Sequence, residues 1–171
     1  MSFVPGIHRC RRGLPSPFFL PWLGAEMKST FLLSDEALER LPVWAVPESC
    51  GAVVSFWGMV RNQNEGKSVH KLEYTAYEVL AEKEGLRIVN ESLERFSIDA
   101  VRVVHRLGLL EIGEAAVVVE VASGHRGEAF EACRWVIDEV KHRVPIWKRE
   151  FYEQGGAEWV MCHHSPILTG K

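Results

Sequence analysis

KHRVPIWKRE, residues 141–150, is the stretch at which the predicted fold changes direction. Apolar residues at helical spacing lead up to it, and Pro145 has no backbone N–H with which a helix could continue. We therefore expect the helix to end near His142 or Arg143 and a strand to run over 146–151. The stretch predicts a tight helix-to-strand turn with basic side chains on both sides of it.

The apolar centre of this stretch is expected to anchor the turn. Ile146 and Trp147 have the character of buried residues. If Trp147 points to the core, alternation along the strand directs Lys148 to the face opposite Trp147. Arg143 and Arg149 have no assigned role, and we expect both in solvent. The whole chain has a formal charge of −3, so an anion site built from these residues would be local and not part of a generally basic surface.

Composition is that of an ordinary globular protein. The 171 residues are 47% hydrophobic and 25% charged, which suffices for one domain with its own core. The acidic balance disfavours a nucleic-acid binder, and no run of 18 apolar residues predicts a membrane helix. Four cysteines without a CxxC pair are typical of reduced thiols in a cytoplasmic protein and predict neither a metal site nor a disulfide framework.

The N-terminal segment differs in character from the rest. Residues 1–28 combine arginines, prolines and the apolar run FFLPWLG, which Pro21 interrupts and no clear cleavage site follows. This pattern favours a disordered leader, or a mis-called start with Met27 as the true one, over a signal peptide. We predict a single domain over 29–165 and a short tail over 166–171.

Periodicity predicts six strands and two main helices. Strands are expected at 51–60, 69–75, 101–107, 115–122, 146–151 and 158–162, and helices over 77–96 and from SGHRG (123–127) to about 143. The order β-β-α-β-β-α-β-β favours an α+β sandwich with a mixed or antiparallel sheet over a doubly wound parallel fold. The polar segment 61–67 is expected to be a mobile loop, and 109–113 a turn.

Each helix has one predicted apolar face. On the first helix it comprises Val79, Leu86, Val89, Leu93 and Phe96. On the second helix it comprises Ala129, Cys133, Val136, Ile137 and Val140. We expect these two faces to pack on the sheet.

Lys141 and Lys148 are the basic residues best placed for chemistry. Lys141 continues the apolar face at helical spacing, so its stem begins on the core side while its ammonium group can reach a pocket. The turn would bring Lys148 near it, and two close ammonium groups are unfavourable unless an anion lies between them. The alternative remains that Lys141 only caps the helix C-terminus and that Lys148 is a solvent-facing strand lysine.

Further basic residues fall at the ends of predicted core strands. His125 and Arg126 lie in SGHRG, ahead of a helix N-terminus whose backbone N–H groups favour anions. Arg61 ends the first strand, where adjoining loops often carry function. The alternative for SGHRG is a simple capping turn. No GxSxG, HExxH or dinucleotide-binding motif is present, so the basic residues indicate a phosphorylated or otherwise anionic substrate.

Five segments carry a resemblance to a known family: FWGMVR (56–61), LEYTAYEVLAEKE (72–84), HRLGLLEIGE (105–114), SGHRGEAFEAC (123–133) and DEVKHRVPIWKRE (138–150). Together they resemble the large subunit of molybdopterin synthase, the MoaE family. The resemblance covers about Thr30 to Trp159, and PIWKRE after a D-x-x-K helix end is its most specific part.

The resemblance implies a sulfurtransferase of molybdenum cofactor biosynthesis with a hammerhead-type α+β fold. Its substrate would be cyclic pyranopterin monophosphate. The sulfur would come from the C-terminal Gly-Gly thiocarboxylate of a small ubiquitin-like subunit of the MoaD type. The family's heterotetramer implies a central homodimer of this chain with one small subunit at each end. We expect no cofactor, metal, nucleic acid or membrane, and a cytoplasmic setting.

The resemblance also implies roles for single residues. Lys141 and Lys148 fall on the family's two active-site lysines, and Arg61, His125 and Arg126 fall on basic positions that line its substrate pocket. We expect Lys141 at the reacting centre and Lys148 on the phosphate or on transition-state charge.

One departure from the family concerns the C-terminal region. After Trp159, relatives often carry an arginine that reaches the neighbouring subunit's site, and His163 is the nearest substitute here. The main alternative to an enzyme is a non-catalytic module that binds a ubiquitin-like tail or a phosphorylated ligand.

Overall fold

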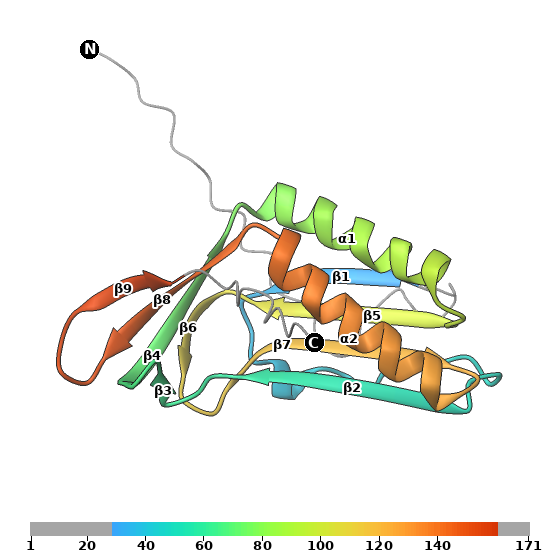
Figure 1. The fold of residues 1–171 in the computed structure, drawn as a ribbon, viewed down its shortest axis with the longest axis horizontal. Coiled ribbons are helices and arrows are strands. Elements are labelled where there is room, and N and C mark those ends of the chain that lie inside the picture. The colour runs from blue at the N-terminus through green and yellow to red at the C-terminus, as the bar shows by residue number, and fades with distance from the viewer. Residues whose placement is uncertain (1–28, 161–171) are drawn as a thin grey trace, which may run out of the picture.

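Four strands form the central sheet. The computed structural model describes residues 29–160, and the strand order of this sheet is β1-β5-β7-β2 (Figure 1). β1 and β5 are parallel, whereas the pairs β5–β7 and β7–β2 are antiparallel. The bounds are Ser29–Ser34 for β1, Ala52–Met59 for β2, Ala100–Arg106 for β5 and Ala115–Ser123 for β7. The central sheet is therefore mixed.

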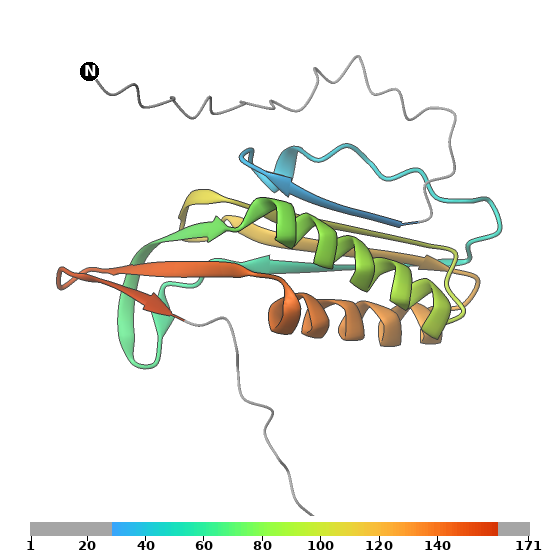
Figure 2. The same ribbon diagram turned by 90° about the horizontal axis from the view of Figure 1, so that it is seen from above.

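Two helices cover one face of this sheet. α1 (Glu78–Arg95) packs mainly on β1 and β5, and α2 (Arg126–Arg143) packs on β7 and β2 (Figure 2). The short 3-10 helix η1 (Leu38–Arg40) lies on the opposite face, where Leu38 is fully buried. The inner strands therefore meet apolar partners on both faces, which explains why β7 is a near-continuous hydrophobic run.

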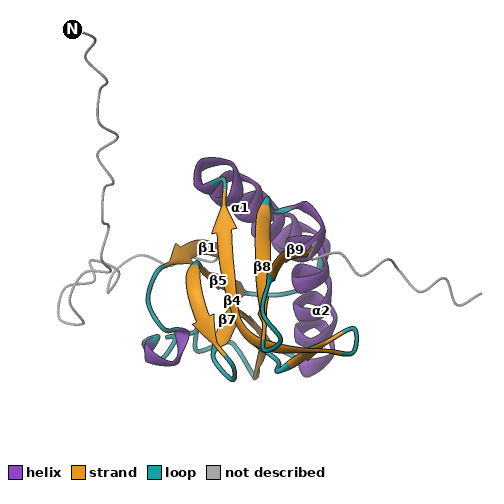
Figure 3. Ribbon diagram, turned by 90° about the vertical axis from the view of Figure 1, so that its left-hand side faces the viewer, coloured by secondary structure: helices purple, strands orange, loops and turns teal. Residues whose placement is uncertain are grey.

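A second, antiparallel sheet stands at one end of the central sheet (Figures 1 and 3). β4 pairs with β8, β8 pairs with β9, and the short strands β3 and β6 also pair with β4. The bounds are Gln63–Asn64 for β3, Lys67–Ala76 for β4, Gly108–Glu111 for β6, Ile146–Tyr152 for β8 and Ala157–Val160 for β9. This arrangement confirms the predicted α+β class with two main helices.

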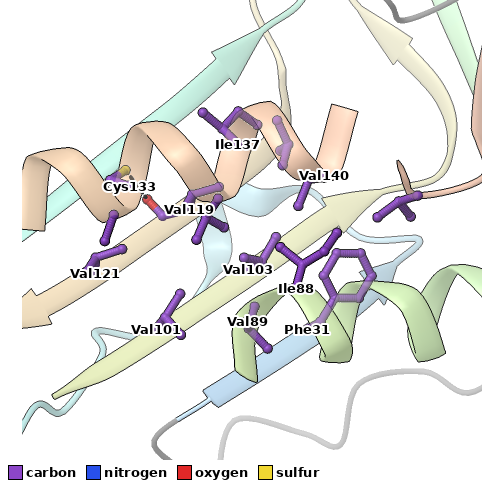
Figure 4. Packing of buried hydrophobic residues seen from close by; sticks show 14 of the residues in the cluster. Phe31, Ile88, Val89, Val101, Val103, Val119, Val121, Cys133, Ile137 and Val140 are labelled. Atoms are coloured by element: carbon purple, nitrogen blue, oxygen red, sulfur yellow. Dashed lines mark hydrogen bonds between the residues drawn. The ribbon is translucent and has the colours of Figure 1, made fainter. Parts of the chain in front are cut away.

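The main core lies between the central sheet and the helices. Ile88 and Val89 of α1 and the apolar face of α2 meet strand side chains there (Figure 4). The predicted face of α2 is buried in full: Ala129, Cys133, Val136, Ile137 and Val140. Burial raises the pKa of the Cys133 thiol to about 11, so this cysteine is a core residue and not a nucleophile.

The six predicted strands and both helices are confirmed, but three short strands were not predicted from periodicity. They are β1, β3 and β6. Residues 109–113, predicted as a turn, overlap β6, and the predicted loop 61–67 contains β3 and folds as a hairpin with β4. These strands are short or at sheet edges, so they bury too little surface for a clear alternation.

On α1 the predicted face is partly wrong. Val79 and Leu86 are 74% and 46% exposed. Val89 is buried as predicted, and Leu93 and Phe96 pack partly buried against the core. The helix also buries Ala81, Gly85, Ile88 and Ser92, which were not predicted. A Cβ on Gly85 would lie 2.3 Å from the ring of Phe31, so α1 approaches β1 along its small residues. The close contact of Gly85 with Phe31 was not predicted, because β1, which carries Phe31, was not predicted.

Gly85→Ala is expected to destabilise the fold, because the added methyl group overlaps Phe31 and such overpacking costs about 1–3 kcal/mol. Alanine gains roughly 1 kcal/mol over glycine inside a helix, so the expected net loss is up to about 2 kcal/mol. Denaturant midpoints measure the change. Gly127→Ala is the control, since nothing lies within 4 Å of a Cβ at that position. A midpoint for Gly85→Ala at or above that of the wild type would contradict the close packing.

Some sequence predictions fall outside the described residues. These are the leader over 1–28, the tail over 166–171 and the substitution at His163. Within 29–160, no helix is long and apolar enough to cross a membrane.

Candidate active site

The turn between α2 and β8 forms where the sequence predicts it. α2 ends at Arg143 and β8 begins at Ile146, with Pro145 between them. The carbonyl of Pro145 accepts a hydrogen bond from the N–H of Tyr77, the residue that precedes α1, at 3.3 Å. The turn is therefore tied to the start of α1 as well as to the core.

Lys141 lies on the last turn of α2 and is exposed. Its Nζ atom lies 5.8 Å from the centroid of the Phe56 ring, which belongs to β2 and packs against the main core. A cation over an aromatic face gains electrostatic attraction without losing its access to water. Lys141 forms no ion pair with any residue from 29 to 160, so its charge is available to a ligand.

Lys148 has a very different setting. Its side chain is only 16% exposed, and its Nζ lies 3.0 Å from Oε1 of Glu150, which is 2% exposed. Oε2 of Glu150 accepts hydrogen bonds from Asn64 Nδ2 at 3.1 Å and from the Tyr152 hydroxyl at 3.2 Å. Glu150 is thus a buried carboxylate held by three donors, one of which is the candidate catalytic lysine.

The side of β8 that faces inward is the opposite of the predicted one. Alternation holds, but Trp147 is 44% exposed and Lys148 shares the inward face with Ile146 and Glu150. The prediction that Trp147 is buried is therefore wrong. The physical reason is the buried Glu150, which needs a cation on its own side of the strand.

An aromatic pair lies beside Lys148. Tyr74 of β4 is directly opposite Lys148 in the strand register, and its ring meets that of His105 edge to face with centroids 5.1 Å apart. Desolvation lowers the pKa of the buried His105 to about 4, so its imidazole is neutral near pH 7. His105 therefore contributes packing and not positive charge.

The other predicted site residues occupy two different ends of α2. Arg61 is exposed just after β2, the strand that carries Phe56 under Lys141. His125 and Arg126 are exposed at the start of α2. Arg126 lies fifteen residues from Lys141, about 22 Å along the helix axis at 1.5 Å per residue. Within one chain, His125 and Arg126 are not brought to the lysines.

The alternative for SGHRG is a capping turn. His125 occupies the N-cap position of α2, but its side chain makes no capping hydrogen bond. Its imidazole and the Arg126 guanidinium are thus left exposed at a helix N-terminus. The local structure is compatible with an anion contact from another molecule.

Two surface hollows are bordered by residues other than the two lysines. One, of about 310 Å³, is bordered by Trp44 and Trp57, and one of about 220 Å³ is bordered by Lys67 and Tyr152. Neither of these two hollows is lined by Lys141 or Lys148.

Several site residues were missed by sequence reasoning. They are Phe56, Asn64, Glu150 and Tyr152. A signal was present for Glu150, because an acid two positions after Lys148 in a strand lies on the same face. No local pattern links Asn64 to it across 86 residues.

The fold and the site together define a two-sheet α+β protein with a lysine-bearing helix–strand turn at the junction of its sheets. A family model described as MoaE protein matches residues 33–143. The chain belongs to the MoaE family. Lys141 lies inside the matched residues, and Lys148 lies five positions beyond them.

Relatives and solved structures agree with this assignment. The chain is 52% identical over 107 residues to the molybdopterin synthase catalytic subunit of Pyrococcus abyssi, covering 63% of this chain and 72% of the relative. It is 45% identical over 109 residues to the subunit of the same name from Thermoplasma volcanium, covering 64% and 80%. A crystal structure of molybdopterin synthase from Staphylococcus aureus superposes with a TM-score of 0.69 at 36% identity, covering 79% of this chain and 96% of that one.

Proposed function

We propose that this chain is the catalytic subunit of a molybdopterin synthase. It transfers sulfur from the C-terminal thiocarboxylate of a small ubiquitin-like subunit to cyclic pyranopterin monophosphate, forming the dithiolene of molybdopterin. The observation that carries the proposal is Lys141 at the end of α2, an exposed ammonium over Phe56 with no ion pair to any residue from 29 to 160, in a chain of the MoaE family. Both reactants are anions, and a fixed cation lowers the cost of bringing them together.

The chemistry needs a cation where negative charge develops on the leaving oxygen. The thiocarboxylate sulfur attacks a carbon of the pterin side chain, so a C–S bond forms while a C–O bond breaks. The leaving oxygen takes a proton from, or is stabilised by, an ammonium group. Water then cleaves the resulting thioester, its hydroxyl going to the acyl carbon of the carrier, and the sulfur stays on the pterin. A second round completes the dithiolene.

The two lysines suit different parts of this chemistry. Lys141 is unpaired within 29–160 and can turn toward a reacting oxygen, which supports its role at the reacting centre. Lys148 is held by Glu150 and keeps a fixed direction, which suits a standing contact with phosphate or with transition-state charge. Arg61 is proposed to extend the same basic surface.

The test is reconstitution with a thiocarboxylated carrier subunit and the pterin precursor. Dithiolene product from the wild-type chain is expected. Carrier binding without product would support the alternative, a non-catalytic module for a ubiquitin-like tail. The printed name of the relatives, catalytic subunit, supports a partner subunit. A cytoplasmic setting is supported by Cys50 and Cys133, which are free thiols.

A central homodimer is part of the proposal. His125 and Arg126 lie about 22 Å from Lys141 along α2, so only a second copy could bring them to the same substrate. Two-fold symmetry would then give two equal shared sites.

Mixing two inactive variants tests the shared site. A Lys141→Ala chain and a His125→Ala/Arg126→Ala chain, refolded together in equal amounts, should recover about a quarter of wild-type turnover. Half of the dimers are mixed, and each mixed dimer has one intact site of two. No recovery in a mixture that contains mixed dimers, verified by mass, would show that the site is not shared.

A further inference from the structure

Arg143 is held by three carboxylates from both helices. Its Nε donates to Glu84 Oε1 at 2.7 Å, and its Nη1 donates to Glu139 Oε2 at 3.1 Å. Nη1 and Nη2 together engage both oxygens of Glu91 at 2.6 and 3.1 Å. The side chain is 22% exposed, so the prediction that Arg143 points into solvent is wrong. Two of its partners lie 59 and 52 residues away in the sequence.

The interactions of Arg143 in this cluster are stronger than an ordinary surface ion pair. A bidentate arginine–carboxylate contact has a fixed direction, and partial burial reduces its screening by water. The hydrogen bond from Arg143 is the main cause that lowers the pKa of Glu91. Hydrogen bonds to Glu91, Glu84 and Glu139 raise the pKa of the Arg143 guanidinium, so this side chain keeps its positive charge.

The position of Arg143 connects this cluster to the candidate active site. It is the last residue of α2, two positions after Lys141 and five before Lys148. Glu84 and Glu91 both belong to α1, whose start is bonded to the turn through Tyr77. The end of α2 is therefore fixed to α1 on one side of the turn, and β8 leaves it on the other.

We propose that Arg143 is a positioning residue for Lys141. By holding the last turn of α2 against α1, it fixes the backbone from which the Lys141 side chain extends over Phe56, and it sets the start of the turn that leads to Lys148. This inference rests on the proposed function for its kinetic consequence, but its structural consequence can be measured without turnover. Displacements near 1 Å at a reacting group can cost about a hundredfold in rate.

The test compares Arg143→Met with Arg134→Met in the full chain assembled with its carrier. Arg134 is a matched control, an exposed arginine on α2 whose contact with Asp138 is 3.9 Å long. Arg143→Met should lower kcat about 10- to 100-fold at a temperature where it is fully folded, with KM changed less than about threefold. Arg143→Lys should recover part of the loss. An unchanged kcat in folded Arg143→Met, with only a lower unfolding midpoint, would overturn the proposal.

A second readout follows Lys141 directly. Reductive ¹³C-methylation labels the lysines for NMR, and the signal that disappears in Lys141→Arg is that of Lys141. The nearby Phe56 ring should move the chemical shift of this signal away from those of exposed lysines such as Lys83. Arg143→Met should move the signal toward the Lys83 position, and Arg134→Met should leave it unchanged. A Lys141 signal that does not move in Arg143→Met would overturn the proposal even if the wild type makes product. Absence of product from the wild type would instead count against the proposed function.

Discussion

We expect Lys141→Ala to reduce turnover by about 10²- to 10⁴-fold while leaving carrier binding intact. This is the size expected when a group that donates a proton or stabilises transition-state charge is removed. The loss should fall on kcat, because the lysine acts mainly where charge develops on the leaving oxygen. Lys141 is exposed and makes no ion pair with the rest of the described chain, so its removal leaves no buried charge behind. Single-turnover product formation and carrier titration measure the two quantities separately.

Lys83→Ala is the matched control for this experiment. Lys83 is also an exposed lysine on a helix, and it belongs to α1 and not to the turn between α2 and β8. It should keep wild-type turnover. Full activity of Lys141→Ala would exclude the assigned role, and equal losses of turnover and carrier binding would show that Lys141 supports the interface and not the chemistry.

Much of the fold could be predicted because its signals are local. The buried run of β7 and the three- and four-residue spacing on α2 each follow from the packing of one element. Pro145 marks the end of α2 by removing a donor, which is also a local effect. Only part of the face of α1 could be predicted in this way, because the rest depends on Phe31 of an unpredicted strand fitting against Gly85.

For the candidate site, too, local features could be predicted from the sequence and contacts with distant residues could not. Residue types and a family resemblance indicated Lys141 and Lys148, but their surroundings depend on distant partners. Arg143 looked like a solvent residue because its carboxylates on α1 lie more than 50 residues away. Trp147 looked like a core residue because its size suggested burial, whereas the buried charge of Glu150 decides which side of β8 faces inward.

Glu150 gives Lys148 two tasks that a single substitution cannot separate. The lysine compensates a buried carboxylate, and it is also a proposed contact for anionic substrate. Removing one partner of a buried pair is far more costly than removing both, because the remaining charge is left without compensation. Loss of activity in a Lys148 variant would therefore be ambiguous by itself, since a damaged fold would lose activity as well.

Lys148→Met is expected to lower the free energy of unfolding by about 3–5 kcal/mol, because among residues 29–160 Glu150 then keeps only the uncharged donors Asn64 and Tyr152. Lys67→Met, which breaks an exposed pair with Glu158, should cost much less. Denaturant midpoints measure both variants. Equal costs for the two would show that the Lys148–Glu150 pair is not a buried pair in solution.

The double variant Lys148→Met/Glu150→Leu separates the two tasks of Lys148. Replacing both charges by apolar side chains of similar volume should recover most of the lost stability, since no uncompensated carboxylate remains. Turnover should stay as low as in the single variant, because the cation that faces substrate is still missing. Recovered turnover in the double variant would mean that Lys148 serves the fold alone, and the chemistry would then depend on Lys141 without it.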